Sequence, residues 1–166
     1  MTLNLFASEV QVLRNTLTGA GMTASNKEGP LLVVGHDNLI EGNTATLDQV
    51  GGGRGVGIAS IIVRGDDNRL VGNVASNGLL EGIFVGVEAE RTTLIGNTTN
   101  DNGHEFGFGN GITIEGPGTG TSLGDNTAND NAQLGIDASS GVTDLGGNRA
   151  SGNGTAAQCT GVVCQP

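Results

Sequence analysis

Two stretches of this 166-residue sequence carry side chains suited to binding or transforming a ligand. The stretch 103–110 joins a His–Glu pair, which can exchange protons with a substrate, to two phenyl rings separated by glycine. A second glycine-rich stretch, 49–55, is inserted at the same corner of the repeat two copies earlier. The copy between them, through 78–81, has no insertion at this corner. Loops on a rigid scaffold often carry function, so we predict a notch between these loops; the alternative is two tolerated insertions. The predicted ligand-binding residues are Arg54, Glu81, His104, Glu105, Phe106 and Phe108.

A second group of candidate residues is acidic. Asp66, Asp67, Glu88 and Glu90 fall in neighbouring repeats, with Arg91 beside them. Calcium takes several oxygen ligands, so these four carboxylates form a candidate calcium site, and calcium is the one cofactor that the sequence suggests. The alternative is a solvated polar face whose ion pairs contribute little.

Charge and composition limit the classes of partner. The formal net charge is −10 and there is a single lysine, which argues against a nucleic-acid partner, because such a partner requires clustered Lys and Arg. No apolar run approaches the length of a membrane span, so we expect no membrane insertion. The chain has 31 glycines, four phenylalanines and no Tyr or Trp. The core must therefore consist mainly of Leu, Ile, Val and Ala.

The two cysteines, Cys159 and Cys164, lie close together near the end of the sequence. Four residues separate them, so a local disulfide is possible, and it would indicate an oxidising compartment. The alternative is a pair of free thiols in a loop. We expect residues 155–166 to form a cap or tail and residues 1–154 to form the main domain.

An internal repeat positions all these residues. Each copy has an apolar residue, an Asn three residues later, and a small or apolar residue two positions after the Asn. Such a recurrence at 22–30 residues is typical of a solenoid. The apolar residues are Val12, Ile40, Leu70, Leu94, Leu123 and Leu145; the ladder asparagines are Asn15, Asn43, Asn73, Asn97, Asn126 and Asn148; the following residues are Leu17, Ala45, Ala75, Thr99, Ala128 and Ala150.

A second pattern lies between these asparagines. Segments 82–85, 111–114 and 135–138 share a Gly-Ile-x-apolar pattern, and 31–34 and 61–63 are looser versions. Each predicts a short strand followed by a corner. In a parallel stack the turns lie about 4.8 Å apart, so like residues lie above one another and the Asn amides can form a ladder.

These two patterns resemble those of the right-handed parallel β-helix repeat family, which includes pectate-lyase-like and NosD-like proteins. The resemblance extends over 10–154 and implies an all-β, right-handed parallel β-helix of about six turns. The family includes lyases, hydrolases, epimerases and adhesins. The Gly-His-Gly and Asp-Pro-His motifs of its hydrolases and epimerases are absent from this sequence.

The sequence therefore favours an extracellular or cell-surface β-helix module, structural or carbohydrate-associated, whose partner is a polysaccharide. The first alternative is a polysaccharide lyase or epimerase with its site at 103–110 or in turns outside this sequence. The second is an adhesin or ice-binding solenoid. Because Leu3 stands where Leu31 and Ile61 stand in later repeats, we also expect the first turn to continue into more β-helix or to pack on another copy.

Overall fold

The computed structural model describes residues 3–18, 29–47 and 58–166, and every regular element in these ranges is a short β-strand. Apolar side chains alternate with glycine or polar ones over only a few residues, and corner-forming residues follow, so the strands are short. In chain order they are β1 (Leu3–Leu5), β2 (Gln11–Leu13), β3 (Thr16–Thr18), β4 (Leu31–Val33), β5 (Leu39–Glu41), β6 (Thr44–Thr46), β7 (Ala59–Val63), β8 (Arg69–Val71), β9 (Glu81–Val85), β10 (Thr93–Ile95), β11 (Ile112–Ile114), β12 (Ser122–Gly124), β13 (Ile136–Ala138), β14 (Thr143–Gly146) and β15 (Cys159–Thr160).

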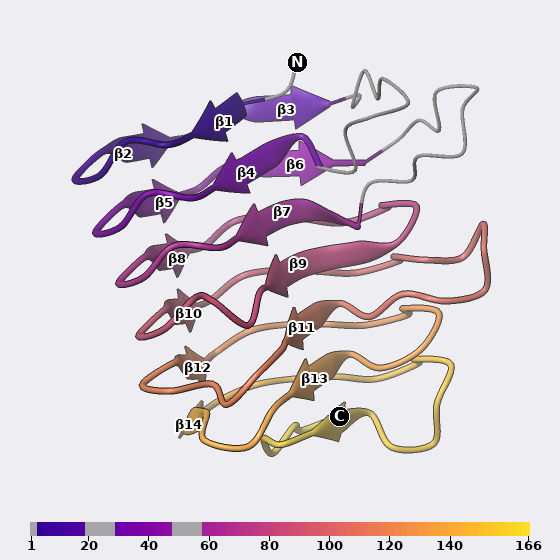
Figure 1. Cartoon of the computed structure of the whole chain (residues 1–166). Coiled ribbons are helices and arrows are strands. Elements are labelled where there is room, and N and C mark those ends of the chain that lie inside the picture. The colour runs from indigo at the N-terminus through magenta and orange to yellow at the C-terminus, as the bar shows by residue number, and fades with distance from the viewer. Residues whose placement is uncertain (1–2, 19–28, 48–57) are drawn as a thin grey trace.

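The strands stack into parallel sheets, and successive turns of the chain lie one below another (Figure 1). The larger sheet has the order β1-β4-β7-β9-β11-β13-β15 and the second has the order β14-β12-β10-β8-β5-β2. Strands β3 and β6 begin a third column, which single bridges continue from Thr44 to Gln165. The predicted all-β parallel solenoid is thus confirmed, whereas its right-handed sense and number of turns stay predictions.

The core is a stack of like aliphatic residues inside the coil. Leu31, Ile61, Ile83, Ile112 and Ile136 are in register along the larger sheet and are fully buried. The predicted apolar positions of the second sheet also point inward, from Val12 to Leu123. All six residues two positions after the ladder asparagines are buried as well.

The prediction that Leu145 lies in the core is wrong. Leu145 is 55% exposed, because the register between β12 and β14 shifts and Leu123 pairs with Asp144 instead. The Asp144 carboxylate accepts hydrogen bonds from the Gly146 and Val163 backbone amides and from the Asn148 side chain. These hydrogen bonds hold Asp144 at the end of the ladder and leave Leu145 outside the coil.

The predicted asparagine ladder is confirmed. From Asn15 to Asn126, each ladder Asn donates from its Nδ2 to the Oδ1 of the Asn one turn below, and the series ends at Asn148. The N···O distances are 3.0–3.1 Å. The same Oδ1 also accepts the backbone N–H of the upper Asn, as in the 3.0 Å bond from Asn97 to Asn126. A buried amide without partners would be costly, so the ladder lets a polar corner lie inside the coil.

Two further ladders were not predicted. At one corner Asn38 donates to Asn68, and at another Asn102 donates to Asn131 and Asn131 donates to Asn153, each over 3.0 Å. The second series ends on the side chain of Gln158, which accepts at 2.9 Å. In the described part of the chain the coil therefore has hydrogen-bonded amides at three corners.

The corners share a left-handed backbone. The residue before every ladder Asn of the first series has a positive φ. Glycine precedes Asn43, Asn73, Asn97 and Asn148, whereas Arg14 precedes Asn15 and Asp125 precedes Asn126. A left-handed non-glycine residue costs roughly 1–2 kcal/mol, and the ladder hydrogen bonds offset this cost. This geometry explains the recurrence of Gly directly before Asn in the sequence.

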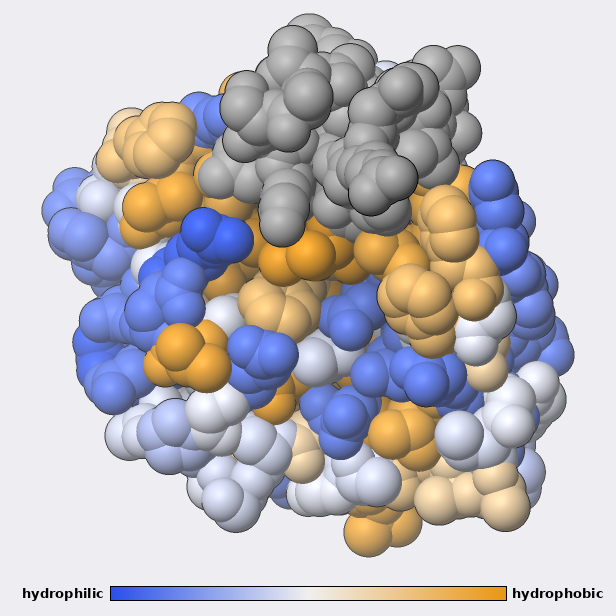
Figure 2. All heavy atoms as spheres, turned by 45° about the vertical axis from the view of Figure 1, so that its right-hand side comes forward, coloured by the Kyte–Doolittle hydropathy of each residue, from blue (hydrophilic) through white to orange (hydrophobic). Residues whose placement is uncertain are grey.

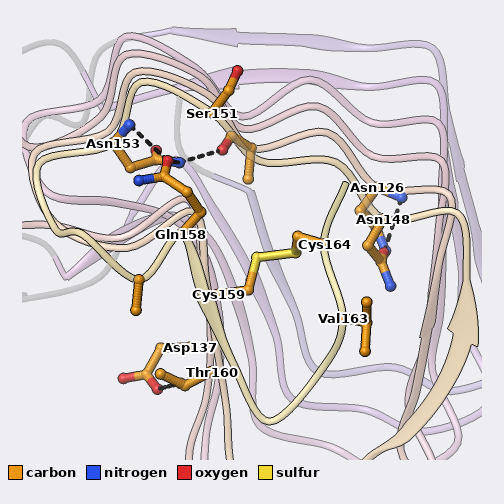
Figure 3. The surroundings of a disulfide bond; sticks show 12 residues. Asn126, Asp137, Asn148, Ser151, Asn153, Gln158, Cys159, Thr160, Val163 and Cys164 are labelled. Atoms are coloured by element: carbon orange, nitrogen blue, oxygen red, sulfur yellow. Dashed lines mark hydrogen bonds between the residues drawn. A yellow bond between two sulfur atoms is a disulfide. The ribbon is translucent and has the colours of Figure 1, made fainter. Parts of the chain in front are cut away.

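The last segment continues the stack. Strand β15 pairs with β13, and Gln165 bridges to Arg149 in the third column. A disulfide joins Cys159 to Cys164 and closes the loop between them (Figure 3). Both cysteines and Val162 pack against the core, so this segment covers the apolar interior below β13.

Candidate functional site

A hollow of about 160 Å³ lies beside the larger sheet, where several strands begin. Its lining comes from segments that precede or begin four neighbouring strands, β7, β9, β11 and β13. The space-filling view in Figure 2, which brings the right-hand side of Figure 1 forward, shows apolar and strongly polar surface side by side. The hollow is lined by Ile58, Leu80, Glu81, Phe108, Gly109 and Gln133.

Glu81, the first residue of β9, lies on the outer face of the sheet. The Thr113 hydroxyl donates a hydrogen bond to its carboxylate, and the neighbours of Thr113, Ile112 and Ile114, point into the core. Because side chains alternate along a strand, Thr113 is outside the coil. In β9 the alternation is interrupted at Gly82, where a Cβ would meet the buried Asn102 amide, so Glu81 faces outward and lines the hollow although Ile83 points inward. The Asn110 side chain donates to the Thr113 hydroxyl over 3.0 Å, which orients that hydroxyl toward Glu81.

Burial raises the pKa of the Glu81 carboxyl from 4.5 to about 7. The hydrogen bond from Thr113 opposes this pKa shift, and the carboxylates of Glu115 and Asp137 add to it. Within the described residues the buried Oε2 of Glu81 has no hydrogen-bond partner. A carboxyl with this pKa can hold or release a proton near neutrality.

Phe108 supplies an aromatic surface at the rim of the hollow. It is 52% exposed, and its ring centroid lies 6.1 Å from that of Phe106, with the planes tilted by 43°. The loop is held close to its surroundings at two glycines with positive φ. A Cβ at Gly103 would lie 2.5 Å from the Phe108 carbonyl oxygen, and a Cβ at Gly109 would lie 2.7 Å from that of Leu80. Both glycines are therefore required for this packing.

The other predicted ligand-binding residues are not among those that line the hollow. His104 is exposed, and its Nε2 donates to the backbone carbonyl of Asp130 over 2.6 Å, which directs the ring toward a corner. Glu105 is exposed in the same loop, and Phe106 reaches the site through its contact with Phe108. Arg54 lies outside the described residues. The structure thus brings together Glu81 and Phe108.

The candidate calcium ligands all pair with arginine. The Arg91 guanidinium contacts the carboxylates of Asp66, Asp67 and Glu90 at 2.7–3.2 Å. Its positive charge and hydrogen bonds hold the pKa of the Asp67 carboxyl below its usual range. Glu88 lies 3.6 Å from the Arg64 guanidinium. Over the described ranges no three His, Cys, Asp or Glu side chains form a group that could hold a metal ion. The ion pairs are those expected of a solvated polar face, and the calcium site stays a prediction.

A second hollow, of about 280 Å³, adjoins these ion pairs. His36 is exposed at its edge and contacts Asp37 at 2.7 Å, and this hydrogen bond raises the pKa of the imidazole. Arg64 and Arg91 pair with these acids, but four carboxylates face two guanidinium groups, so the hollow keeps a net negative charge. Its lining is Val34, His36, Arg64, Gly65, Asp66, Asp67 and Glu88.

Sequence reasoning did not find Gln133, Leu80 or Thr113. These residues lie at the site because neighbouring turns stack in a particular register. The repeat pattern could have placed them there only if the strands of successive turns had first been aligned. In the described part of the chain no helix is long and apolar enough to span a bilayer. Comparison with family models, curated proteins and solved structures finds no match.

Proposed function

We propose that this protein is an extracellular carbohydrate-binding β-solenoid and that the hollow beside β9 is its binding site. One observation carries the proposal: the exposed ring of Phe108, the carboxyl of Glu81 and the amide of Gln133 border a single hollow. Ligand sites commonly combine apolar or aromatic surface with a few polar groups that fix orientation. A sugar ring presents both an apolar C–H face and hydroxyl groups, so it matches this combination.

The rigidity of the scaffold supports the same proposal. The hollow is positioned by strands whose corners are fixed by buried amide ladders, so little conformational entropy remains to be lost on binding. The disulfide between Cys159 and Cys164 supports a location outside the reducing cytosol. An acidic net charge of −10 is compatible with solubility at the cell surface.

A glycan array probed with the wild-type protein and two phenylalanine variants tests this proposal. Phe108→Ala removes the ring at the hollow, whereas Phe6→Ala removes a 69% exposed ring that does not line the hollow. We expect Phe108→Ala to weaken binding by roughly tenfold, the loss for about 1.4 kcal/mol of contact, and Phe6→Ala to bind like wild type. Equal binding by all three proteins, or none by wild type, would overturn the proposal.

An acid–base enzyme acting on polysaccharide is the second candidate, because the pKa of Glu81 is raised to about 7 by burial. General acids and bases work best when their pKa lies near the operating pH. Incubation with the glycans that bind, followed by chromatography of the products, distinguishes the two candidates. Products formed by wild type but not by Glu81→Gln would favour the enzyme, and unchanged glycans would favour a binding module.

A further inference from the structure

We propose that the carbohydrate ligand is a linear chain of amino sugars with free ammonium groups, lying across the strands from the Glu81 hollow toward Asp137. This inference rests on the proposed function and specifies the ligand class. It follows from the direction in which the hollow extends, the charges beside it, and the aromatic ring at its rim.

The direction of the hollow indicates a chain rather than a single sugar. Its lining comes from segments at the start of β7, β9, β11 and β13, which are consecutive strands of one sheet. Neighbouring strands lie about 4.8 Å apart, so the lining extends along the axis of the coil. Beside Glu81, which accepts from Thr113, the outer face continues in register from Phe84 through Thr113, Asp137 and Thr160.

The charges along this line favour a cation. The carboxylates of Glu115 and Asp137 both act electrostatically on Glu81. Across the described ranges no Arg or His forms an ion pair with any of these three acids; Arg64, Arg91 and His36 pair elsewhere. Asp137 instead accepts a hydrogen bond from the Thr160 hydroxyl. Ammonium groups would offset this mutual repulsion, whereas a uronic-acid chain would increase it.

The ring and the buried carboxyl oxygen favour the same ligand group. A cation over an exposed phenyl face gains roughly 0.5–1 kcal/mol, and Phe108 is half-exposed beside Glu81. The Oε2 of Glu81 lacks a hydrogen-bond partner within the described part of the chain. An ammonium group is a donor only, so it can supply the missing hydrogen bond to the ionised Glu81 carboxylate and favours that form, whereas a ligand carboxylate could bond only to the protonated form.

Paired oligosaccharides of equal length test the inference by isothermal titration calorimetry. The probes are the glucosamine hexamer and the N-acetylglucosamine hexamer, in mildly acidic buffer at low and high salt. We expect the glucosamine hexamer to bind roughly tenfold more tightly at low salt and to lose most of that advantage at high salt. Equal binding, or tighter binding of the acetylated hexamer, would overturn the inference.

Two isosteric variants locate the charge effect. Asp137→Asn keeps an acceptor for Thr160 and should weaken glucosamine-hexamer binding several-fold while leaving the acetylated hexamer unchanged. Glu41→Gln removes the same charge from β5 in the other sheet and should leave both affinities unchanged. If Phe108→Ala abolishes binding of either hexamer but Asp137→Asn changes nothing, carbohydrate binding stands and the amino-sugar inference fails. If wild type binds neither hexamer nor any arrayed glycan, both fail.

Discussion

Replacing Glu81 with Gln should remove a pH-dependent destabilisation of the folded protein. In the folded chain burial raises the pKa of Glu81 from 4.5 to about 7. The folded state therefore keeps this proton more readily than the unfolded state. The stabilisation that the folded state gains from the protonated Glu81 carboxyl is fully present below pH 4.5, is lost as the pH rises, and is gone above about pH 7.

The size of the effect follows from the pKa difference. One pKa unit corresponds to 1.36 kcal/mol, so the two limits differ by about 3 kcal/mol. Gln keeps the shape of the side chain and an oxygen that accepts from the Thr113 hydroxyl. The free energy of unfolding of Glu81→Gln minus that of wild type should thus be about 3 kcal/mol larger above neutrality than at low pH.

Urea unfolding at a series of pH values measures this difference directly. Plotting the free energy of unfolding of Glu81→Gln minus that of wild type removes the contribution of the other carboxylates. Glu41→Gln, in β5, corrects for the loss of one negative charge from an acidic chain. A difference curve that stays flat between pH 4.5 and about 7 would refute the assigned environment of Glu81.

Three other substitutions test the scaffold through thermal or urea unfolding. Leu94→Ala should cost about 2–5 kcal/mol, since Leu94 is fully buried and the change leaves a cavity; a near-neutral effect would contradict its inward position. Asn131→Ala should cost roughly 1–3 kcal/mol, because Asn102 and the backbone then lose an acceptor inside the coil, whereas Asn129→Ala on the partly exposed side of the same turn should cost less. Reducing the bond between Cys159 and Cys164 should lower stability by about 2 kcal/mol, the chain-entropy value for so short a loop, and an unchanged midpoint would show that the disulfide does not secure the last turn.

The repeating part of the fold was predictable because stacking places equivalent residues above one another. One interior position then sees the same environment in each turn, and the sequence repeats Leu, Asn and Ala accordingly. The two additional ladders left a signal of the same kind. Asn38 and Asn68 each lie five residues before a ladder Asn, and Asn102, Asn131 and Asn153 each lie five residues after one. Aligning whole turns would have revealed them.

The site was only partly predictable because it depends on how unlike segments meet. The loop containing Phe108 was identified from its composition, and Glu81 from its position between two insertions. The direction of the His104 ring depends on the corner backbone at Asp130, which the local sequence does not specify. The exposure of Leu145 follows from a register shift created by Asp144, and a periodic pattern cannot indicate an irregularity of this type.

The most direct test of the central claim is aromatic NMR of the protein with ¹³C-labelled phenylalanine, titrated with the glucosamine hexamer. The chain has four phenylalanines and no other aromatic residue except its two histidines, and spectra of Phe108→Ala and Phe6→Ala assign the relevant signals. Binding at the hollow predicts a saturable shift of the Phe108 ring signals while those of Phe6 stay in place. Saturable binding that shifts Phe6, or that leaves Phe108 unchanged, would contradict the proposed site.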